Sequence, residues 1–143
     1  MKILSIHPVI PSTTPYPLVS HHVPAGFPSP AEDSLERSLS LDELLIVHPE
    51  STFFVRVSGD SMQGAGIFPH DILVVDKQKE AVTGSIIIAV VNGEMTVKRL
   101  YRSAHGTIEL HAENPHYLPI TFHHEEELMI WGVVVGVVRT LNT

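Results

Sequence analysis

The stretch Ser85–Tyr101, SIIIAVVNGEMTVKRLY, decides the fold of this chain. Its first half is apolar and rich in β-branched residues, and its second half mixes polar and apolar residues. Asn92-Gly93 lies between the halves, and this pair is typical of a two-residue type I′ turn. The stretch therefore predicts two antiparallel strands, Ser85–Asn92 and Glu94–Tyr101, joined as a hairpin.

Similar short segments lie on both sides of the hairpin, each rich in β-branched or aromatic residues. The candidate strands are Thr52–Ser58, Asp71–Asp76, Thr107–His111, Leu118–Thr121 and Leu128–Thr140. Many short strands separated by turn residues predict a mainly β fold, with a folded, antiparallel, barrel-like sheet. Helix-capping patterns at Ser29-Pro30-Ala31-Glu32 and Ser40-Leu41-Asp42-Glu43 predict one or two short helices ahead of it.

The first 30 residues differ in composition, because they contain seven of the 11 prolines. Proline breaks helices and is disfavoured in central strands. We therefore expect residues 1–28 to form an extended, mobile tail without a packed layer, and residues 29–143 to form one folded domain.

The overall composition excludes several classes of protein. Nine Lys and Arg against 16 Asp and Glu give a net charge of −7, which argues against a basic face for sequence-specific DNA binding and favours a protein partner. Cysteine is absent, so disulfides and thiolate metal sites are excluded, as fits a reducing cytoplasm. No run approaches the roughly 18 apolar residues of a membrane span, so we expect no membrane association.

A serine on a predicted turn is the first candidate for chemistry. Ser61 lies in Ser58-Gly59-Asp60-Ser61-Met62, directly after a predicted strand, and two glycines follow it. A nucleophilic serine needs such a turn, where nearby backbone N–H groups can hold an oxyanion. Gly-Asp-Ser alone is more typical of an ordinary surface turn, so the pattern by itself is a weak indication of a nucleophile.

Lys98, in the second strand of the hairpin, is the second candidate. Alternation places it on one face with Thr96 and Leu100, but does not show which face is the core. A solvated lysine on an edge strand is the ordinary alternative.

The ten histidines show no spacing that indicates a metal site. His123 and His124 are adjacent and would face opposite sides of a strand. We therefore expect no metal and no cofactor.

Several motifs, taken in order, carry a resemblance. They are Ala25-Gly26 in the proline-rich segment, the Ser61 turn, Gly66–Asp76, Val97–Leu100, Leu110–Ile120 and Trp131–Val134. Together they resemble the LexA/UmuD family of self-cleaving proteins, whose catalytic domain belongs with the S24 serine peptidases.

This resemblance implies roles for particular residues. Ser61 would be the nucleophile, Lys98 the general base, and the backbone N–H groups of Ser61 and Met62 the oxyanion donors. The scissile bond would be Ala25–Gly26, although cysteine is common at the position of Ala25. Only 25 residues precede Gly26, too few for a DNA-binding helix-turn-helix, so the chain looks like the UmuD branch of the family.

The resemblance also implies partners. A RecA filament would stimulate cleavage, and the processed homodimer would join a UmuC-like Y-family DNA polymerase for error-prone lesion bypass in the SOS response. The alternatives are a non-enzymatic dimerisation module, a LexA-like repressor fragment, a type I signal peptidase and a secretory precursor. A type I signal peptidase needs a membrane anchor and a secretory precursor needs an apolar leader, and we expect neither in this sequence.

Overall fold

The hairpin is at the centre of the structure, a computed structural model that describes residues 1–12, 38–124 and 127–141. Strands β4 (Ile86–Val91) and β5 (Glu94–Arg102) pair antiparallel across Asn92-Gly93. Both turn residues have positive φ, 51° and 79°, as a type I′ turn requires. The predicted hairpin is confirmed.

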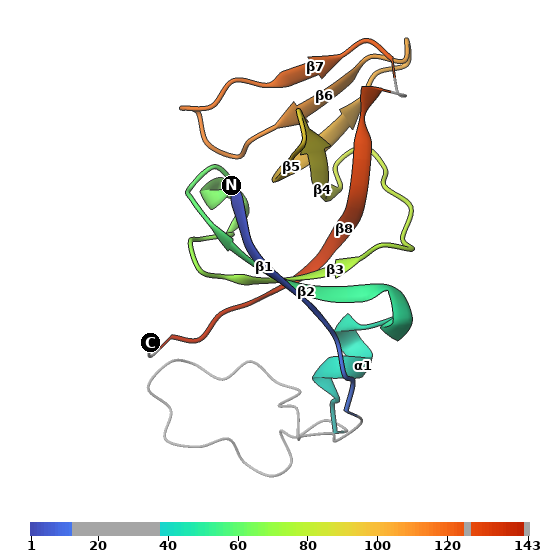
Figure 1. The fold of residues 1–143 in the computed structure, drawn as a ribbon, viewed down its shortest axis with the longest axis vertical. Helices are drawn as coiled ribbons and strands as arrows, with labels where there is room; N and C mark the ends of the chain where they lie inside the picture. The colour runs from blue at the N-terminus through green and yellow to red at the C-terminus, as the bar shows by residue number, and fades with distance from the viewer. Residues whose placement is uncertain (13–37, 125–126, 142–143) are drawn as a thin grey trace.

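The other strands surround this hairpin in one antiparallel sheet. They are β1 (Lys2–Pro8), β2 (Thr52–Ser58), β3 (Ile72–Asp76), β6 (Ile108–His111), β7 (Ile120–Phe122) and β8 (Met129–Val138). The order is β1-β2-β3-β8-β4-β5-β6-β7, and Lys2 of β1 also pairs with Thr96 of β5. That pairing closes six strands into a barrel, with β6 and β7 as an extension beyond β5 (Figure 1). The predicted fold class is confirmed.

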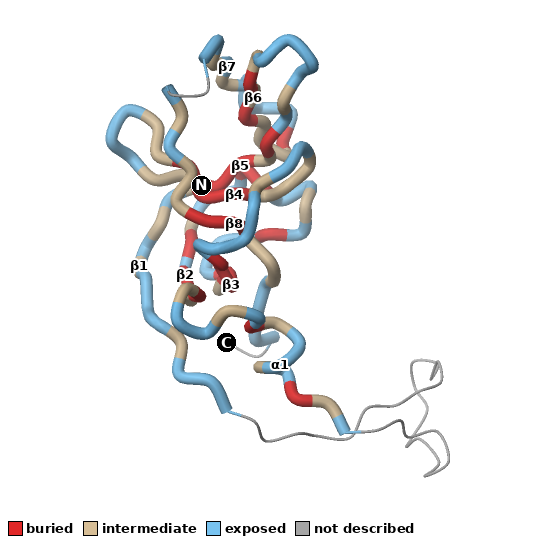
Figure 2. Tube along the Cα trace, turned by 90° about the vertical axis from the view of Figure 1, so that its right-hand side faces the viewer, coloured by how far each residue is buried: buried red, intermediate tan, exposed pale blue. Residues whose placement is uncertain are grey.

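The core consists of two clusters of buried side chains inside the sheet. Figure 2 marks in red where the buried residues lie along the chain. One cluster, around Val55, Met62 and Ile88, fills the barrel. The other, around Leu100 and Leu110, lies between the hairpin and the β6–β7 extension. Because β5 contributes to both clusters, its two faces are both covered.

A short helix, α1 (Leu41–Leu45), packs on β8. Ser40 Oγ accepts a hydrogen bond from the backbone N–H of Glu43 at 3.3 Å, which confirms the predicted N-cap. At Gly136 of β8 an added Cβ would lie 2.9 Å from Leu45 Cδ2, so the glycine allows the helix to approach.

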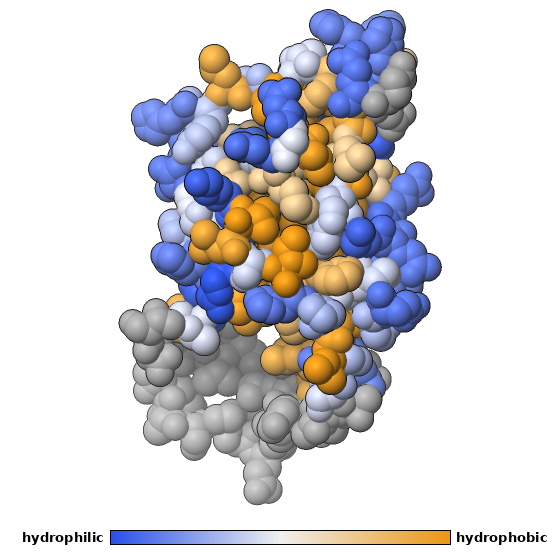
Figure 3. Space-filling view, viewed as in Figure 1, coloured by the Kyte–Doolittle hydropathy of each residue, from blue (hydrophilic) through white to orange (hydrophobic). Residues whose placement is uncertain are grey.

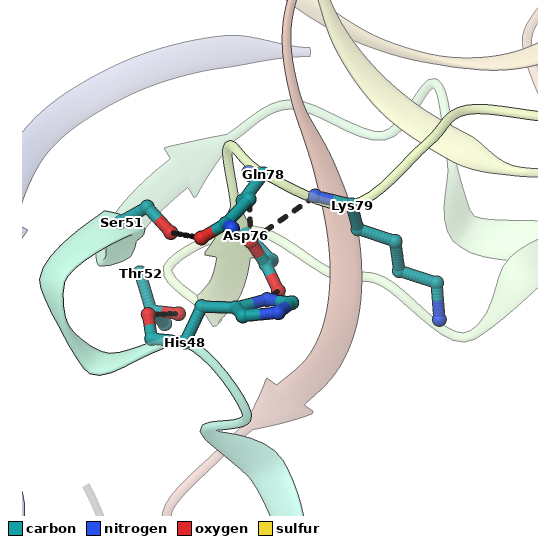
Figure 4. Close-up of polar contacts among 6 residues, drawn as sticks. All are labelled: His48, Ser51, Thr52, Asp76, Gln78 and Lys79. Atoms are coloured by element: carbon teal, nitrogen blue, oxygen red, sulfur yellow. Dashed lines mark hydrogen bonds and ion pairs between the residues drawn. The ribbon is translucent and has the colours of Figure 1, made fainter.

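The segment after α1 is tied to the end of β3 by a polar cluster (Figure 4). His48 Nδ1 lies 2.7 Å from Asp76 Oδ2, and the same carboxyl group accepts hydrogen bonds from the backbone N–H groups of Gln78 and Lys79. Burial alone would raise the pKa of Asp76, but these hydrogen bonds outweigh it and lower the pKa. A short 3₁₀ turn, Pro49–Ser51, then leads into β2.

One expectation about the N-terminal segment is wrong. Residues 2–8 form β1, which pairs with β2 from Lys2–Ser58 to Pro8–Phe53. Part of the segment expected to be a mobile tail is therefore packed in the sheet. Pro8 is the last residue of this strand, whose outer side is open there, and proline is tolerated at such a position. Residues 13–37, which include the helix expected after Ser29, lie outside the described residues.

The surface carries apolar side chains across the middle of one face (Figure 3). Exposed large apolar residues include Leu4 and Ile6 of β1, Leu41 of α1, and Val137 and Val138 of β8. Within the described ranges, no helix has both the length and the apolar character needed to cross a membrane.

Candidate active site around Ser61 and Lys98

Ser61 lies on the tight turn that follows β2. Gly59 has a φ of 94°, and Gln63 N donates to Asp60 O at 3.3 Å, so Ser61 and Met62 occupy the centre of the turn. Met62 is completely buried in the barrel and anchors the turn. The fold therefore fixes the backbone of Ser61.

A second segment, Glu113-Asn114, holds the turn from the other side. Glu113 N donates to Ser61 O and Gly64 N donates to Glu113 O, both at 2.8 Å. Asn114 Nδ2 donates to Asp60 O at 3.0 Å. An added Cβ at Gly64 would lie 2.6 Å from Glu113 O, so the two segments approach closely only because residue 64 is glycine.

The backbone N–H groups of Ser61 and Met62 make no hydrogen bond to another described residue. Most buried backbone N–H groups in proteins have a partner, so two neighbours without one are unusual. Such a pair beside a serine hydroxyl has the donors that an oxyanion needs.

Lys98 lies on β5, opposite Ile87 of β4, and only 7% of its surface is exposed. The alternative of a solvated lysine on an edge strand is wrong, because β5 runs between β4 and β6. Burial lowers the pKa of Lys98 below its ordinary value, since the charged ammonium loses solvation. Its amine is therefore closer to the neutral form than that of a surface lysine.

Two residues that sequence reasoning did not single out connect the serine turn to the lysine. Lys98 Nζ lies 5.3 Å from the centre of the Tyr117 ring, within the range of a cation–π contact. Tyr117 OH donates to Asp60 Oδ1 at 2.6 Å, and this hydrogen bond raises the pKa of the tyrosine. Only the adjacency of Asp60 to Ser61 could have indicated such a role from the sequence.

The start of β1 also lies in the site, which the sequence did not predict. The Met1 nitrogen donates to Ser61 Oγ at 2.8 Å, and Thr96 Oγ1 donates to Met1 O at 3.2 Å. Burial lowers the pKa of the Met1 amine, the charge of Lys98 lowers it further, and Asp60 opposes both. Ser61, Lys98 and Met1 thus share one site, in which the Ser61 hydroxyl bonds to Met1.

The other predicted site residues, Ala25 and Gly26, lie outside the described residues. In the described part of the chain, no three His, Asp or Glu side chains are grouped so that they could hold a metal ion. The chemistry of the site is that of a hydroxyl, an amine and backbone N–H groups.

The fold and the site together define a closed β-barrel with a buried lysine near a serine turn. The chain matches the family described as Peptidase S24-like over residues 17–135. Protein SamA of Salmonella typhimurium is 44% identical over 123 residues, which cover 86% of this chain and 84% of SamA. Protein ImpA of Escherichia coli is 40% identical over 123 residues, covering 86% and 83%. The LexA repressor of Bordetella pertussis is 38% identical over 134 residues, covering 94% of this chain and 60% of the repressor.

This chain belongs to the peptidase S24-like family. The resemblance inferred from the ordered motifs is therefore confirmed.

Proposed function

We propose that this chain cleaves its own backbone between Ala25 and Gly26, with Ser61 as nucleophile and Lys98 as general base. The observation that supports the proposal is the burial of Lys98, whose charge acts on the Met1 amine that donates to Ser61 Oγ. An ordinary lysine, with a pKa of about 10.4, is neutral in only about one molecule in 2,500 at pH 7. Burial increases that fraction, and only the neutral amine accepts a proton.

The reaction has two stages. Neutral Lys98 takes the Ser61 proton while Oγ bonds to the carbonyl carbon of Ala25, and the N–H groups of Ser61 and Met62 hold the oxyanion. Lys98 then gives the proton to the nitrogen of Gly26 as the C–N bond breaks. In the second stage Lys98 deprotonates a water molecule, which hydrolyses the ester and restores Ser61 with Ala25 as a carboxylate.

The biological context follows from the family resemblance. A RecA filament on single-stranded DNA stimulates the cleavage, and residues 26–143 form a homodimer that joins a UmuC-like Y-family polymerase for error-prone lesion bypass in the cytoplasm. The acidic net charge and the exposed apolar side chains support protein partners over direct DNA binding.

The test is incubation of the purified protein at pH 10, followed by intact mass spectrometry, with Ser61→Ala in parallel. We expect a new fragment beginning at Gly26 from the unchanged protein and none from the variant. The experiment is repeated at neutral pH with and without an activated RecA filament. A protein that stays intact under all these conditions overturns the proposal and favours the non-enzymatic dimerisation module.

A further inference from the structure

We propose that the surface on which β1 lies is the docking site for the residues that follow the scissile bond, so that Gly26 and its successors replace Met1 and its successors during cleavage. We call this surface the β1-binding edge, and it consists of the backbone of β2 from Phe53 to Ser58 together with Thr96 of β5. The inference rests on the proposed function and adds the path of the substrate.

The Met1 nitrogen occupies the position expected of a leaving amine. It lies 2.8 Å from Ser61 Oγ, where the amine released from Gly26 would lie at the end of the first reaction stage. From that point β1 runs away from Ser61 along β2, from the Lys2–Ser58 pair to the Pro8–Phe53 pair. A chain in this direction occupies the leaving-group side of a peptidase site.

Met1 blocks access to the Ser61 hydroxyl. Ser61 is completely buried, and Met1 lies directly against its Oγ. No carbonyl carbon can approach the hydroxyl while the Met1 nitrogen occupies that position, so β1 has to leave first. No residue of β1 is fully buried and five of its seven residues are exposed, so its separation uncovers mainly Met1 and Ile3, which pack against the barrel core.

The chain between Gly26 and α1 has the length needed to lie along the same edge. If residue 26 takes the place of Met1, a constant shift of 25 puts residue 37 at the place of Ser12. Ser12 O accepts a hydrogen bond from Ser40 Oγ at 3.5 Å, so Ser12 lies next to the start of α1. Three residues span up to about 10 Å, enough to join residue 37 to Ser40 without moving the helix. The same chain can therefore fill the β1-binding edge.

The sequence of the proposed occupant fits an edge strand. Under the shift of 25, Pro28 and Pro30 take the places of Ile3 and Ser5, where the register of β1 shifts and the regular ladder is interrupted. An edge strand has one open side, where proline is tolerated.

A disulfide that holds β1 in place tests the exchange. Lys2 and Ser58 face each other across β1 and β2, at the spacing of facing antiparallel residues, which lies within the range of a disulfide. The chain has no cysteine of its own, so Lys2→Cys together with Ser58→Cys allows only one disulfide within the chain. The control is Glu109→Cys with Thr121→Cys, a facing pair on β6 and β7.

We expect the oxidised Lys2→Cys/Ser58→Cys protein to cut at least tenfold more slowly at pH 10 than its reduced form. The control protein should cut equally fast in both forms. Equal rates for oxidised and reduced Lys2→Cys/Ser58→Cys would overturn the exchange. If no reduced protein cuts, the proposed function fails.

A second measurement tests the docking without any catalysis. Under the shift of 25, residue 27 lies where Lys2 lies in the structure, opposite Ser58. In a Ser61→Ala background we therefore expect Phe27→Cys and Ser58→Cys to form a disulfide within one chain under mild oxidation. The matched control is Pro28→Cys with Ser58→Cys, because the side chain at position 28 would point to the opposite face of the strand from the side chain at position 27. We expect cross-linking at least tenfold slower in the control. Equal cross-linking by both pairs, or none by either, contradicts the proposed path.

Discussion

The nitrogen of Met1 donates a hydrogen bond to Ser61 Oγ at 2.8 Å, in a site that also contains the amine of Lys98. Burial lowers the pKa of both amines, and the charge of Lys98 lowers the pKa of the Met1 amine further. Like charges and burial both disfavour the protonated forms. The site is thus built at some cost to the stability of the folded protein.

The first prediction concerns that cost. Lys98→Met keeps the long side chain and removes the ammonium, so the variant should not cut but should be more stable than the unchanged protein at pH 7. Folding lowers the pKa of Lys98, so the folded state binds fewer protons and its stability rises with pH. The difference between the two proteins should therefore shrink at pH 10, as measured by urea unfolding.

The control for this experiment is Lys79→Met, which removes an exposed lysine side chain. Its stability should differ little from that of the unchanged protein. A Lys98→Met variant that is less stable at pH 7 would contradict the electrostatic account of the site.

The second prediction is the pH dependence of cleavage. Because burial lowers the pKa of Lys98, the rate should rise from pH 7 and level off below 10.5, the ordinary value. Lys98→Arg should lose at least roughly 100-fold in rate at every pH, since arginine stays protonated. Initial rates from mass spectrometry measure both, with Lys77→Arg as the matched control. A flat profile would exclude a lysine base.

The hairpin and the N-terminal strand show how far the sequence predicts this fold. Asn92-Gly93 encodes its turn locally, because few other residue pairs adopt positive φ at both positions. Strand β1 pairs with residues about 50 positions away, and two prolines near its end weaken the local signal. Nothing within residues 1–12 shows that β2 has a free edge to pair with.

The sequence indicated candidate residues for the site and did not indicate their surroundings. Ser61 follows a strand and precedes glycines, a pattern that made it a candidate, and the ordered motifs of the family resemblance gave it a role. Lys98 is kept off the edge of the sheet because β5 pairs with both β4 and β6, and alternation within one strand does not encode those pairings. Tyr117 reaches Lys98 from a loop, where no periodicity predicts the direction of a side chain.

The third prediction concerns the contact between the serine turn and the lysine. Tyr117→Phe keeps the ring near Lys98 Nζ but removes the hydrogen bond to Asp60 Oδ1. Cleavage should slow about fivefold, the rate equivalent of one hydrogen bond, and the pH profile should keep its shape. Tyr101→Phe changes a tyrosine that packs on His111 instead and serves as the control. Cleavage by Tyr117→Phe at the unchanged rate would contradict a positioning role.

The fourth prediction concerns the glycine beneath the turn. Gly64→Ala puts a Cβ 2.6 Å from Glu113 O, a backbone atom that cannot move aside cheaply. We expect a loss of about 1 to 3 kcal/mol in the free energy of unfolding, together with slower cleavage. Gly93→Asn is the control, because its Cβ meets open space and asparagine tolerates positive φ. Equal stability of both variants would contradict the close approach.

The fifth prediction is the acid stability of the barrel. Asp71 is 1% exposed, and Arg139 Nε and Nη2 donate to its carboxylate at 2.7 and 2.6 Å. The hydrogen bonds from Arg139 lower the pKa of Asp71, although burial opposes them. A carboxyl group whose pKa is lowered by folding stabilises the protein above its unfolded-state pKa, about 3.9, and this stability is lost as pH falls through the folded value.

Arg139→Met removes those donors and lets the pKa of Asp71 rise, so acid unfolding should begin at a higher pH than in the unchanged protein. Circular dichroism against pH measures the midpoint, and the two curves should converge once Asp71 is protonated in both proteins. Arg56→Met is the matched control, because Arg56 donates to the backbone carbonyl of His70, which does not titrate. A midpoint that moves equally in both variants would show that loss of a surface cation, and not the buried carboxylate, sets the acid limit.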